Sequence, residues 1–98
     1  MTKSTEETLD IENTGSAASL LLKGATLIGI HVRGDATASY AIDVRKRGGS
    51  WIQDITSGYS GSANYDDVIE QPAHELRVRC SSGTANAGDQ ATVTLIAD

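Results

Sequence analysis

The stretch that decides the fold is residues 39–80, which begins SYAIDVRKRGGSWIQDI (39–55) and ends HELRVRC (74–80). In both segments apolar and polar residues alternate with a period of two, as they do in strands that bury one face. The pair Gly48-Gly49 separates two of these runs and suits a tight hairpin turn. Residues 39–80 therefore predict antiparallel β-structure.

Short apolar or alternating runs continue through the rest of the chain. Turn-forming residues separate them about every 8 to 12 residues, a spacing that is typical of a β-sandwich or jelly roll. We predict seven or eight short strands in one all-β domain, residues 6–98, preceded by a flexible polar arm at residues 1–5. The expected strands are residues 6–14, 17–22, 25–33, 37–45, 51–55, 65–70, 74–82 and 90–97, with a long polar loop or a frayed strand at 56–64.

Composition bounds both the size of the core and the class of partner. The chain has 98 residues, a net charge of −5 and no phenylalanine, so we expect one domain with a thin, largely aliphatic core. The acid excess argues against nucleic-acid binding, which needs a basic surface. The basic residues 45–47 fall at the predicted turn, where a solvated tip is the simpler interpretation and an acidic or phosphate partner is the alternative. No signal peptide or membrane-spanning stretch is evident, so we expect no membrane attachment.

No pattern in the sequence indicates catalysis or a bound cofactor. Cys80 is the only cysteine and continues an inward-facing alternation, so we expect a buried thiol. His31 and His74 lie on different predicted strands, without neighbours at the spacing of zinc ligands. Asp66-Asp67 offers oxygen atoms to Ca²⁺ but lacks the spacing of a calcium loop, so a solvated turn is favoured. We expect a protein that is not an enzyme and that holds no metal or cofactor.

Charged residues gather on the outward positions of three predicted strands. Opposite charges that face each other across strands contribute about 0.2–1 kcal/mol per pair, so a solvated face of mixed charge is one interpretation. The other is a subunit interface, where arginine is enriched and pairs bidentately with carboxylates. The candidate interface residues are Arg33, Asp43, Arg45, Glu75, Arg77 and Arg79, with His31 on the same outward positions.

Three aromatic residues lie in or beside the predicted polar loop. They are Trp51, Tyr59 and Tyr65. Aromatic rings on a loop can stack on sugar rings, so these residues are candidate glycan contacts. The alternative is structural, with Trp51 anchoring the core and the two tyrosines packed under the loop.

The order of the motifs resembles that in small structural proteins of tailed viruses that infect haloarchaea. The motifs are a tyrosine-led strand (YAIDV, 40–44), a glycine turn with a tryptophan (GGSW, 48–51) and an Arg-Val-Arg strand (LRVR, 76–79). The resemblance implies a homo-oligomeric β-sandwich subunit of a virion, as capsid decoration, turret, spike or tail component. It also implies contact with a major capsid or tail protein, and a location in the virion and, during assembly, in the host cytoplasm. Few lysines and an acid excess are compatible with a high-salt proteome.

The same strand, turn, tryptophan and Arg-Val-Arg pattern is also similar to discoidin-like carbohydrate-binding modules. Two hypotheses therefore stay open at this point. The first is a non-enzymatic virion protein whose polar N-terminal residues 1–7 dock on a neighbouring chain. The second is a glycan-binding module that uses the loop aromatics.

Overall fold

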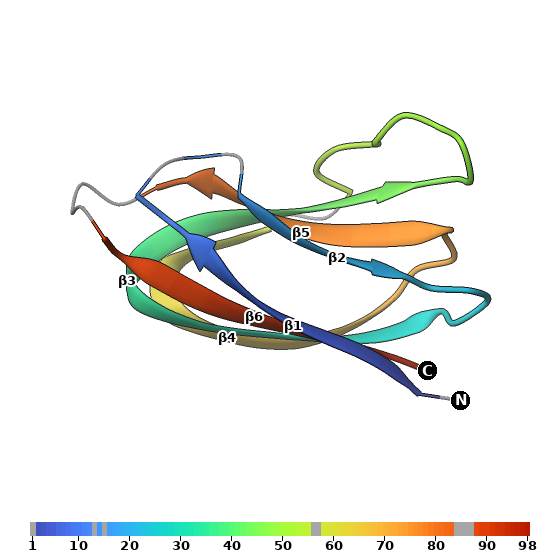
Figure 1. Cartoon of the computed structure of the whole chain (residues 1–98), viewed down its shortest axis with the longest axis horizontal. Helices are drawn as coiled ribbons and strands as arrows, with labels where there is room; N and C mark the ends of the chain where they lie inside the picture. Colours follow the sequence, from blue (N-terminus) through green and yellow to red (C-terminus); the bar gives the residue numbers. More distant parts are fainter. Residues whose placement is uncertain (1, 13, 15, 56–57, 84–87) are drawn as a thin grey trace.

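The structure is antiparallel β-sheet throughout its regular elements. The computed structural model describes residues 2–12, 14, 16–55, 58–83 and 88–98. In this part of the chain six strands form one sheet in the order β1-β6-β3-β5-β2, and β4 pairs with β3 beside that path. The strands are β1 (Lys3–Asp10), β2 (Ala17–Leu21), β3 (Leu27–Arg45), β4 (Tyr59–Glu70), β5 (Glu75–Ser82) and β6 (Gln90–Ala97) (Figure 1).

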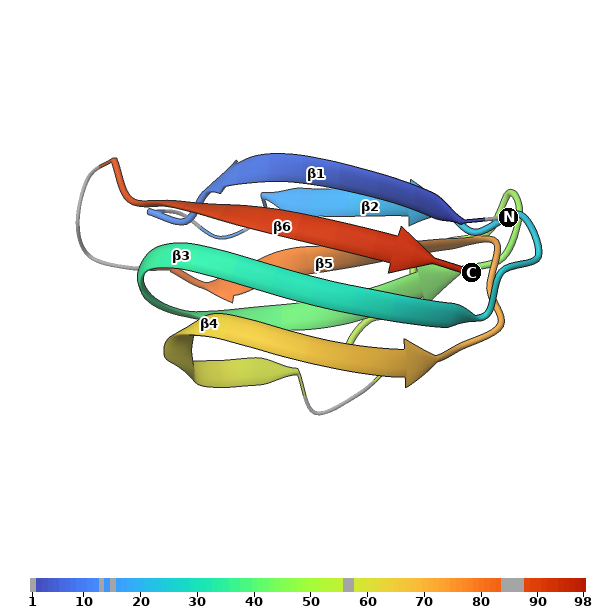
Figure 2. The ribbon, with the colours of Figure 1, turned by 90° about the horizontal axis from the view of Figure 1, so that it is seen from below.

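The long strand β3 makes the sheet coil on itself. Its first half, residues 27–34, pairs with β6 on one side and with β4 on the other, whereas residues 39–45 pair with β5, and β4 continues past the bend to pair with Ala38 and Tyr40. Between the halves the register shifts and the strand doubles back (Figure 2). One layer therefore holds β1, β6, β4 and the first half of β3, and the second holds β5, β2 and the other half. The end strands β1 and β2 approach each other, so the sheet forms a nearly closed, flattened barrel.

The core fills the space between these layers. It is almost entirely aliphatic, as the composition predicts, and Tyr40 is its large aromatic member. Alternation places every second side chain inside, because successive side chains of a strand point to opposite faces. The inward residues include Ile28, Ile30, Val32, Ile42, Leu76, Val78, Val93 and Leu95, all with 0% exposure.

The all-β class, the antiparallel pairing and the single domain are confirmed. The number of strands differs from the seven or eight that we predicted, since the described residues form six. Gly34-Asp35 does not end a strand, because the backbone bends there and continues, so the expected strands 25–33 and 37–45 are both parts of β3. Residues 51–55 form no strand; Ile52 alone makes a β-bridge, to Val44. Of the two alternatives for residues 56–64, the strand is correct from Tyr59 onward, where β4 begins; residues 56–57 lie outside the described residues.

The N-terminal segment is more ordered than predicted. Strand β1 begins at Lys3, so residues 3–5 of the expected arm pair with β6 in full antiparallel register. Met1 lies outside the described residues, and docking of this segment on a neighbouring chain stays a prediction. Within the part of the chain described, no helix has the length and apolar character needed to cross a membrane.

Candidate functional site: charged and aromatic clusters on the barrel

A buried carboxylate organises the outward face of the second layer. Asp43 of β3 has no exposed surface, although its position in the alternation points it out of the barrel. Its oxygens accept hydrogen bonds from Arg77 Nε (2.7 Å), Arg79 Nε (2.9 Å) and the Asp54 backbone N–H (3.0 Å). Burial by itself raises the pKa of Asp43, but these bonds outweigh it and hold the pKa below its ordinary value. The same bond raises the pKa of Arg79.

The segment 46–54 covers this carboxylate. It leaves β3 through the turn at Gly48-Gly49 and returns antiparallel beside the end of β3, where Ile52 bridges Val44. The Trp51 ring contacts two guanidinium groups, with Cζ of Arg45 at 4.7 Å and Cζ of Arg77 at 4.3 Å from its centroid. Trp51 therefore packs on the outside of the second layer, over charged side chains, rather than in the core.

A further pair completes the Asp43 cluster, a name we use for Asp43, Arg45, Trp51, Glu75, Arg77 and Arg79. Arg45 Nε donates to Glu75 Oε1 at 2.6 Å, and the two residues are direct partners in the ladder between β3 and β5. Asp43 and Arg77 are partners in the same ladder. Opposite charges thus face each other across the strands, as we expected for this face.

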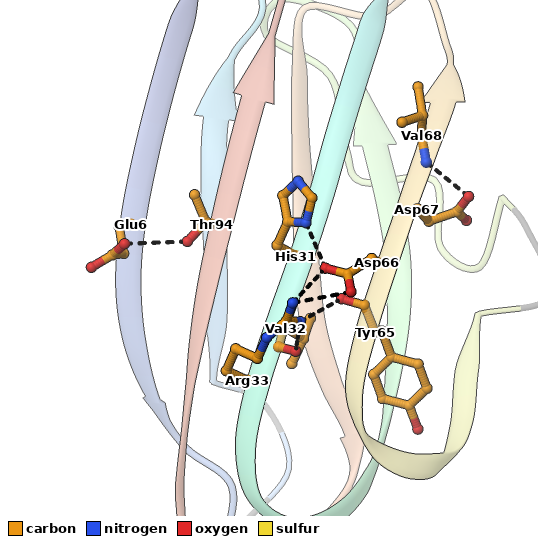
Figure 3. Close-up of polar contacts among 9 residues, drawn as sticks. All are labelled: Glu6, His31, Val32, Arg33, Tyr65, Asp66, Asp67, Val68 and Thr94. Carbon is orange, nitrogen blue, oxygen red and sulfur yellow. Dashed lines mark hydrogen bonds and ion pairs between the residues drawn. The ribbon is translucent and has the colours of Figure 1, made fainter.

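A second charged cluster lies on the outward face of the other layer. Asp66 of β4 receives contacts from two residues of β3, with His31 Nδ1 at 2.6 Å and Arg33 Nη2 at 2.9 Å (Figure 3). The three side chains keep 41%, 55% and 54% of their surface exposed for His31, Arg33 and Asp66. Hydrogen bonds from His31 and then Arg33 lower the pKa of Asp66. In the same region Thr94 of β6 donates to Glu6 of β1 (Figure 3).

The structure divides the predicted interface residues between these two clusters. Asp43, Arg45, Glu75, Arg77 and Arg79 meet in the first, whereas Arg33 lies on the other layer. The sequence did not reveal that Asp66 is the partner of His31 and Arg33. Finding that partner required the pairing of β4 with β3, which places Asp66 opposite His31. A role of these residues in subunit contact stays a prediction.

The tyrosines form a separate cluster at the bend of β4. The rings of Tyr59 and Tyr65 are stacked with centroids 5.1 Å apart, and Tyr40 meets Tyr65 edge-on at 5.8 Å. Tyr65 donates its hydroxyl to the Ala38 carbonyl and accepts a bond from the Ser62 N–H, and Tyr59 donates to Asp67. Trp51 instead contacts Arg45 and Arg77. The rings proposed as glycan contacts are thus split between two places, and sugar binding stays a prediction.

Burial explains the raised pKa values in the interior of this region. Burial, followed by the proximity of Cys80, raises the pKa of Tyr40 to about 12, and burial likewise raises the pKa of the Cys80 thiol. Cys80 has 0% exposure, so its predicted burial is confirmed. The hydroxyl of Tyr40 is buried and has no hydrogen-bond partner among the described residues.

Asp66 and Asp67 belong to strand β4, so the expected strand at residues 65–70 is confirmed and the solvated turn at the same two residues is wrong. Adjacent side chains of a strand point to opposite faces, so the two carboxylates cannot close on one ion in this conformation. Asp66 binds His31 and Arg33, while Asp67 accepts bonds from Tyr59 and from the Val68 N–H. Within the described ranges, no three His, Cys, Asp or Glu side chains gather to hold a metal ion.

Comparison with known proteins identifies a similar fold. No protein-family model matches the sequence, and no curated protein matches it either. The crystal structure of SPBc2 prophage-derived protein YomS is similar over 100% of this chain and 96% of that chain, with a TM-score of 0.64. The two sequences are 9% identical, so the likeness concerns the fold. The match extends over essentially the full length of both chains.

Proposed function

We propose that this chain is a non-enzymatic structural subunit of a phage-like virus particle that assembles with copies of itself. The observation that carries the proposal is the full-length similarity in fold to the prophage-derived protein YomS. A similarity that spans both chains relates two whole domains, whereas a partial match would relate only a shared motif. The resemblance in sequence to small structural proteins of haloarchaeal tailed viruses points in the same direction.

The use of the charged side chains also supports a structural role. The charged residues of the Asp43 cluster are engaged with one another across neighbouring strands, as in the bonds of Asp43 with Arg77 and Arg79 and of Arg45 with Glu75. Such bonds orient side chains and cover the sheet. The role we propose is that of a capsid decoration, turret, spike or tail component, with a major capsid or tail protein as its partner in the particle.

The test is the composition of purified particles. Particles produced by the virus or prophage that encodes the chain would be separated on a density gradient, and the chain quantified by mass spectrometry in each fraction. We expect it to co-sediment with the major capsid or tail protein at a constant ratio, and an antibody to label particles in electron micrographs. Absence from the particle fractions, with the free chain at the top of the gradient, contradicts the proposal.

Self-assembly has its own measurement. Light scattering after gel filtration gives the molar mass of the purified chain at low salt and at about 1 M salt, where charges on the acidic surface are screened within about 3 Å. We expect a mass above that of the 10.3 kDa monomer at high salt and high concentration. A monomer at every salt and protein concentration argues against assembly of the free chain.

A further inference from the structure

The eight basic residues of the chain fall into two groups. Four of them form ion pairs across the strands and belong to the two charged clusters: Arg33, Arg45, Arg77 and Arg79. The other four form no ion pair among the described residues: Lys3, Lys23, Lys46 and Arg47. The chain has 13 acidic residues, so a shortage of carboxylates does not explain the second group. Their place in the fold is therefore informative.

All four unpaired residues lie at the same end of the barrel. Glu75, which begins β5, pairs with Leu21 at the end of β2 and with Arg45 at the end of β3. The turn at residues 22–26 then leads to the start of β3, and β1 begins beside it through its ladder with β6. The start of β1, this turn and the segment after β3 lie together on the right of both views (Figures 1 and 2). We use the name basic end for the four residues that these segments carry, Lys3, Lys23, Lys46 and Arg47.

Charge is distributed unevenly along the barrel. Glu70 and Asp98 lie at the basic end, and Asp54 lies farther along the sheet, beside Asp43. Apart from the bonded pair on β3 and β5, positive side chains thus outnumber negative ones at this end by four to two. The opposite end carries Asp10, Glu12, Asp35 and Asp89. A charge separation of this kind orients a protein as it approaches a charged partner.

The turn that presents two of these charges is fixed to the sheet. Lys46 and Arg47 are exposed, and the Lys46 carbonyl accepts a bond from the Gly49 N–H at 3.0 Å. Behind the turn, Val44 and Ile52 exchange two backbone hydrogen bonds, 3.0 and 2.7 Å long. A surface that is already held in one conformation loses less freedom on binding. The Asp43 cluster contacts the same segment 46–54, so it helps to position a charged contact.

A cleft at this end holds the other two charges. Lys3 and Lys23 line it together with Gly24, Ala25 and Asp98, and its volume is about 280 Å³. Lys3 is half-buried, whereas Lys23 is exposed. Two like charges that line one cleft repel each other, and Asp98 offsets part of this repulsion. An entering carboxylate offsets the rest, so the cleft favours an anionic side chain from outside.

We propose that the chain docks through its basic end on a carboxylate-rich surface of its partner protein in the particle. The inference rests on the proposed structural subunit and adds the chemistry of its contact. A nucleic acid fits this end less well, because its phosphates form a continuous row of charges. Such a row would extend past the basic end onto the wall of the barrel, where exposed carboxylates such as Glu6 and Glu7 repel it. A local acidic patch on a protein meets only the basic end.

Nuclear magnetic resonance locates the contact on the free chain. The probe is a peptide of eight glutamates, added to the nitrogen-15-labelled protein at low salt while every backbone amide signal is followed. We expect the largest shifts at residues 3, 23–24 and 46–49, and their loss at about 0.5 M salt, where charges are strongly screened. A single-stranded DNA of eight nucleotides is the comparison, and we expect it to bind at least about threefold more weakly.

Matched pairs of substitutions separate the site from the total charge. Lys46→Gln combined with Arg47→Gln removes two charges from the basic end and should weaken peptide binding about fivefold, since each exposed ion pair contributes modestly. Arg33→Gln combined with Gln90→Glu makes the same change in net charge away from the basic end. Both of these control side chains are exposed. The control should weaken binding by less than about twofold, because distant charges are screened.

Incorporation into particles tests the same surface in assembly. The virus or prophage that encodes the chain would carry each variant, and the chain would be quantified in particles from a density gradient. We expect the double substitution at Lys46 and Arg47 to lower incorporation about fivefold, and Lys3→Gln combined with Lys23→Gln to do the same. The control at Arg33 and Gln90 should be incorporated like the unaltered chain.

The outcomes separate the docking surface from the proposed function. Peptide shifts at the basic end that its substitutions weaken, with the control unaffected, support the surface. Normal incorporation of both basic-end variants overturns it and leaves the structural subunit in place. Absence of the unaltered chain from particles contradicts the proposed function, and the peptide titration then decides the surface alone. Shifts that lie elsewhere or are absent, an equal loss in the control, or tighter binding of the DNA overturn the surface.

Discussion

Replacing Asp43 with alanine should destabilise the fold more than any other change of a charged residue. The carboxylate is fully buried and accepts bonds from two arginines and from one backbone N–H. Alanine removes these acceptors. The guanidinium groups of Arg77 and Arg79 then stay largely buried without the negative charge that compensates them. It also removes one of the bonds that hold the segment 46–54 against β3.

The magnitude follows from the burial of the partners. Breaking a buried ion pair on one side costs about 3–5 kcal/mol, because the other charge stays without compensation. Arg77 and Arg79 keep 19% and 20% side-chain exposure, so water compensates them in part, and we expect about 2–4 kcal/mol. In a domain of this size each kcal/mol lowers the melting temperature by about 4–8 °C, which gives a fall of about 10–30 °C.

The assay is urea unfolding followed by far-ultraviolet circular dichroism. Asp43→Asn is the matched variant: it keeps an oxygen for the Asp54 N–H but loses the charge, so we expect a smaller loss, about 1–2 kcal/mol. Glu7→Ala removes an exposed carboxylate from β1 and should change stability by less than about 0.5 kcal/mol. If Asp43→Ala costs no more than Glu7→Ala, the carboxylate does not organise this face and the reasoning is refuted.

Four other predictions test separate parts of the structure. The pKa of Asp43 is lower in the folded chain than its value of about 3.9 in the unfolded chain. Its contribution to the free energy of unfolding is therefore complete above about pH 4 and is lost as the pH falls further. The stability of Asp43→Asn, measured by acid unfolding, should lack this dependence on pH. Trp51→Ala should cost about 1–2 kcal/mol and speed tryptic cleavage at residues 46–47, whereas Ile52→Ala should leave cleavage unchanged. Gly58→Ala should destabilise more than Gly61→Ala, as measured by melting temperature: both have positive φ, but only at Gly58 would a Cβ meet a backbone oxygen, at 2.6 Å. Tyr65→Phe should cost about 1–2 kcal/mol through two lost hydrogen bonds, whereas Tyr40→Phe, which removes an unpartnered hydroxyl, should be neutral or stabilising in the same unfolding assay.

Local patterns predicted the strands whose alternation is regular. Strand β6 has the bounds expected from QATVTLIA, and β2 and β5 differ from expectation by a single residue. The alternation of Leu76, Val78 and Cys80 correctly placed all three inside. In these segments the alternation of apolar and polar residues matches the inward and outward positions in the barrel. A period of two in the sequence is therefore sufficient to predict the strand and its buried face.

The errors lie where tertiary pairing overrides local chemistry. Gly34-Asp35 has the composition of a turn, yet β4 and β6 both bond to the adjoining backbone and hold it extended through the bend. Residues 59–64 are polar and rich in small side chains, so the sequence left a loop and a frayed strand open, and the pairing of this edge segment with β3 decides for the strand. Neither ladder leaves a trace in the local sequence, because β3 pairs with residues 19 to 43 positions away in β4 and 57 to 69 positions away in β6.

The same limit explains why the two outward faces look alike in the sequence. Both carry alternating polar residues with arginine, and alternation alone cannot tell a face that is covered from one that is open. In the structure the segment 46–54 covers the Arg-rich face, and Asp43 already uses its bonds within the chain. On the other layer, Val68 of β4 and Ile96 of β6 keep 63% and 38% exposure. The charged residues that the sequence makes conspicuous are therefore engaged first with one another within the single chain, and their role in subunit contact stays a prediction.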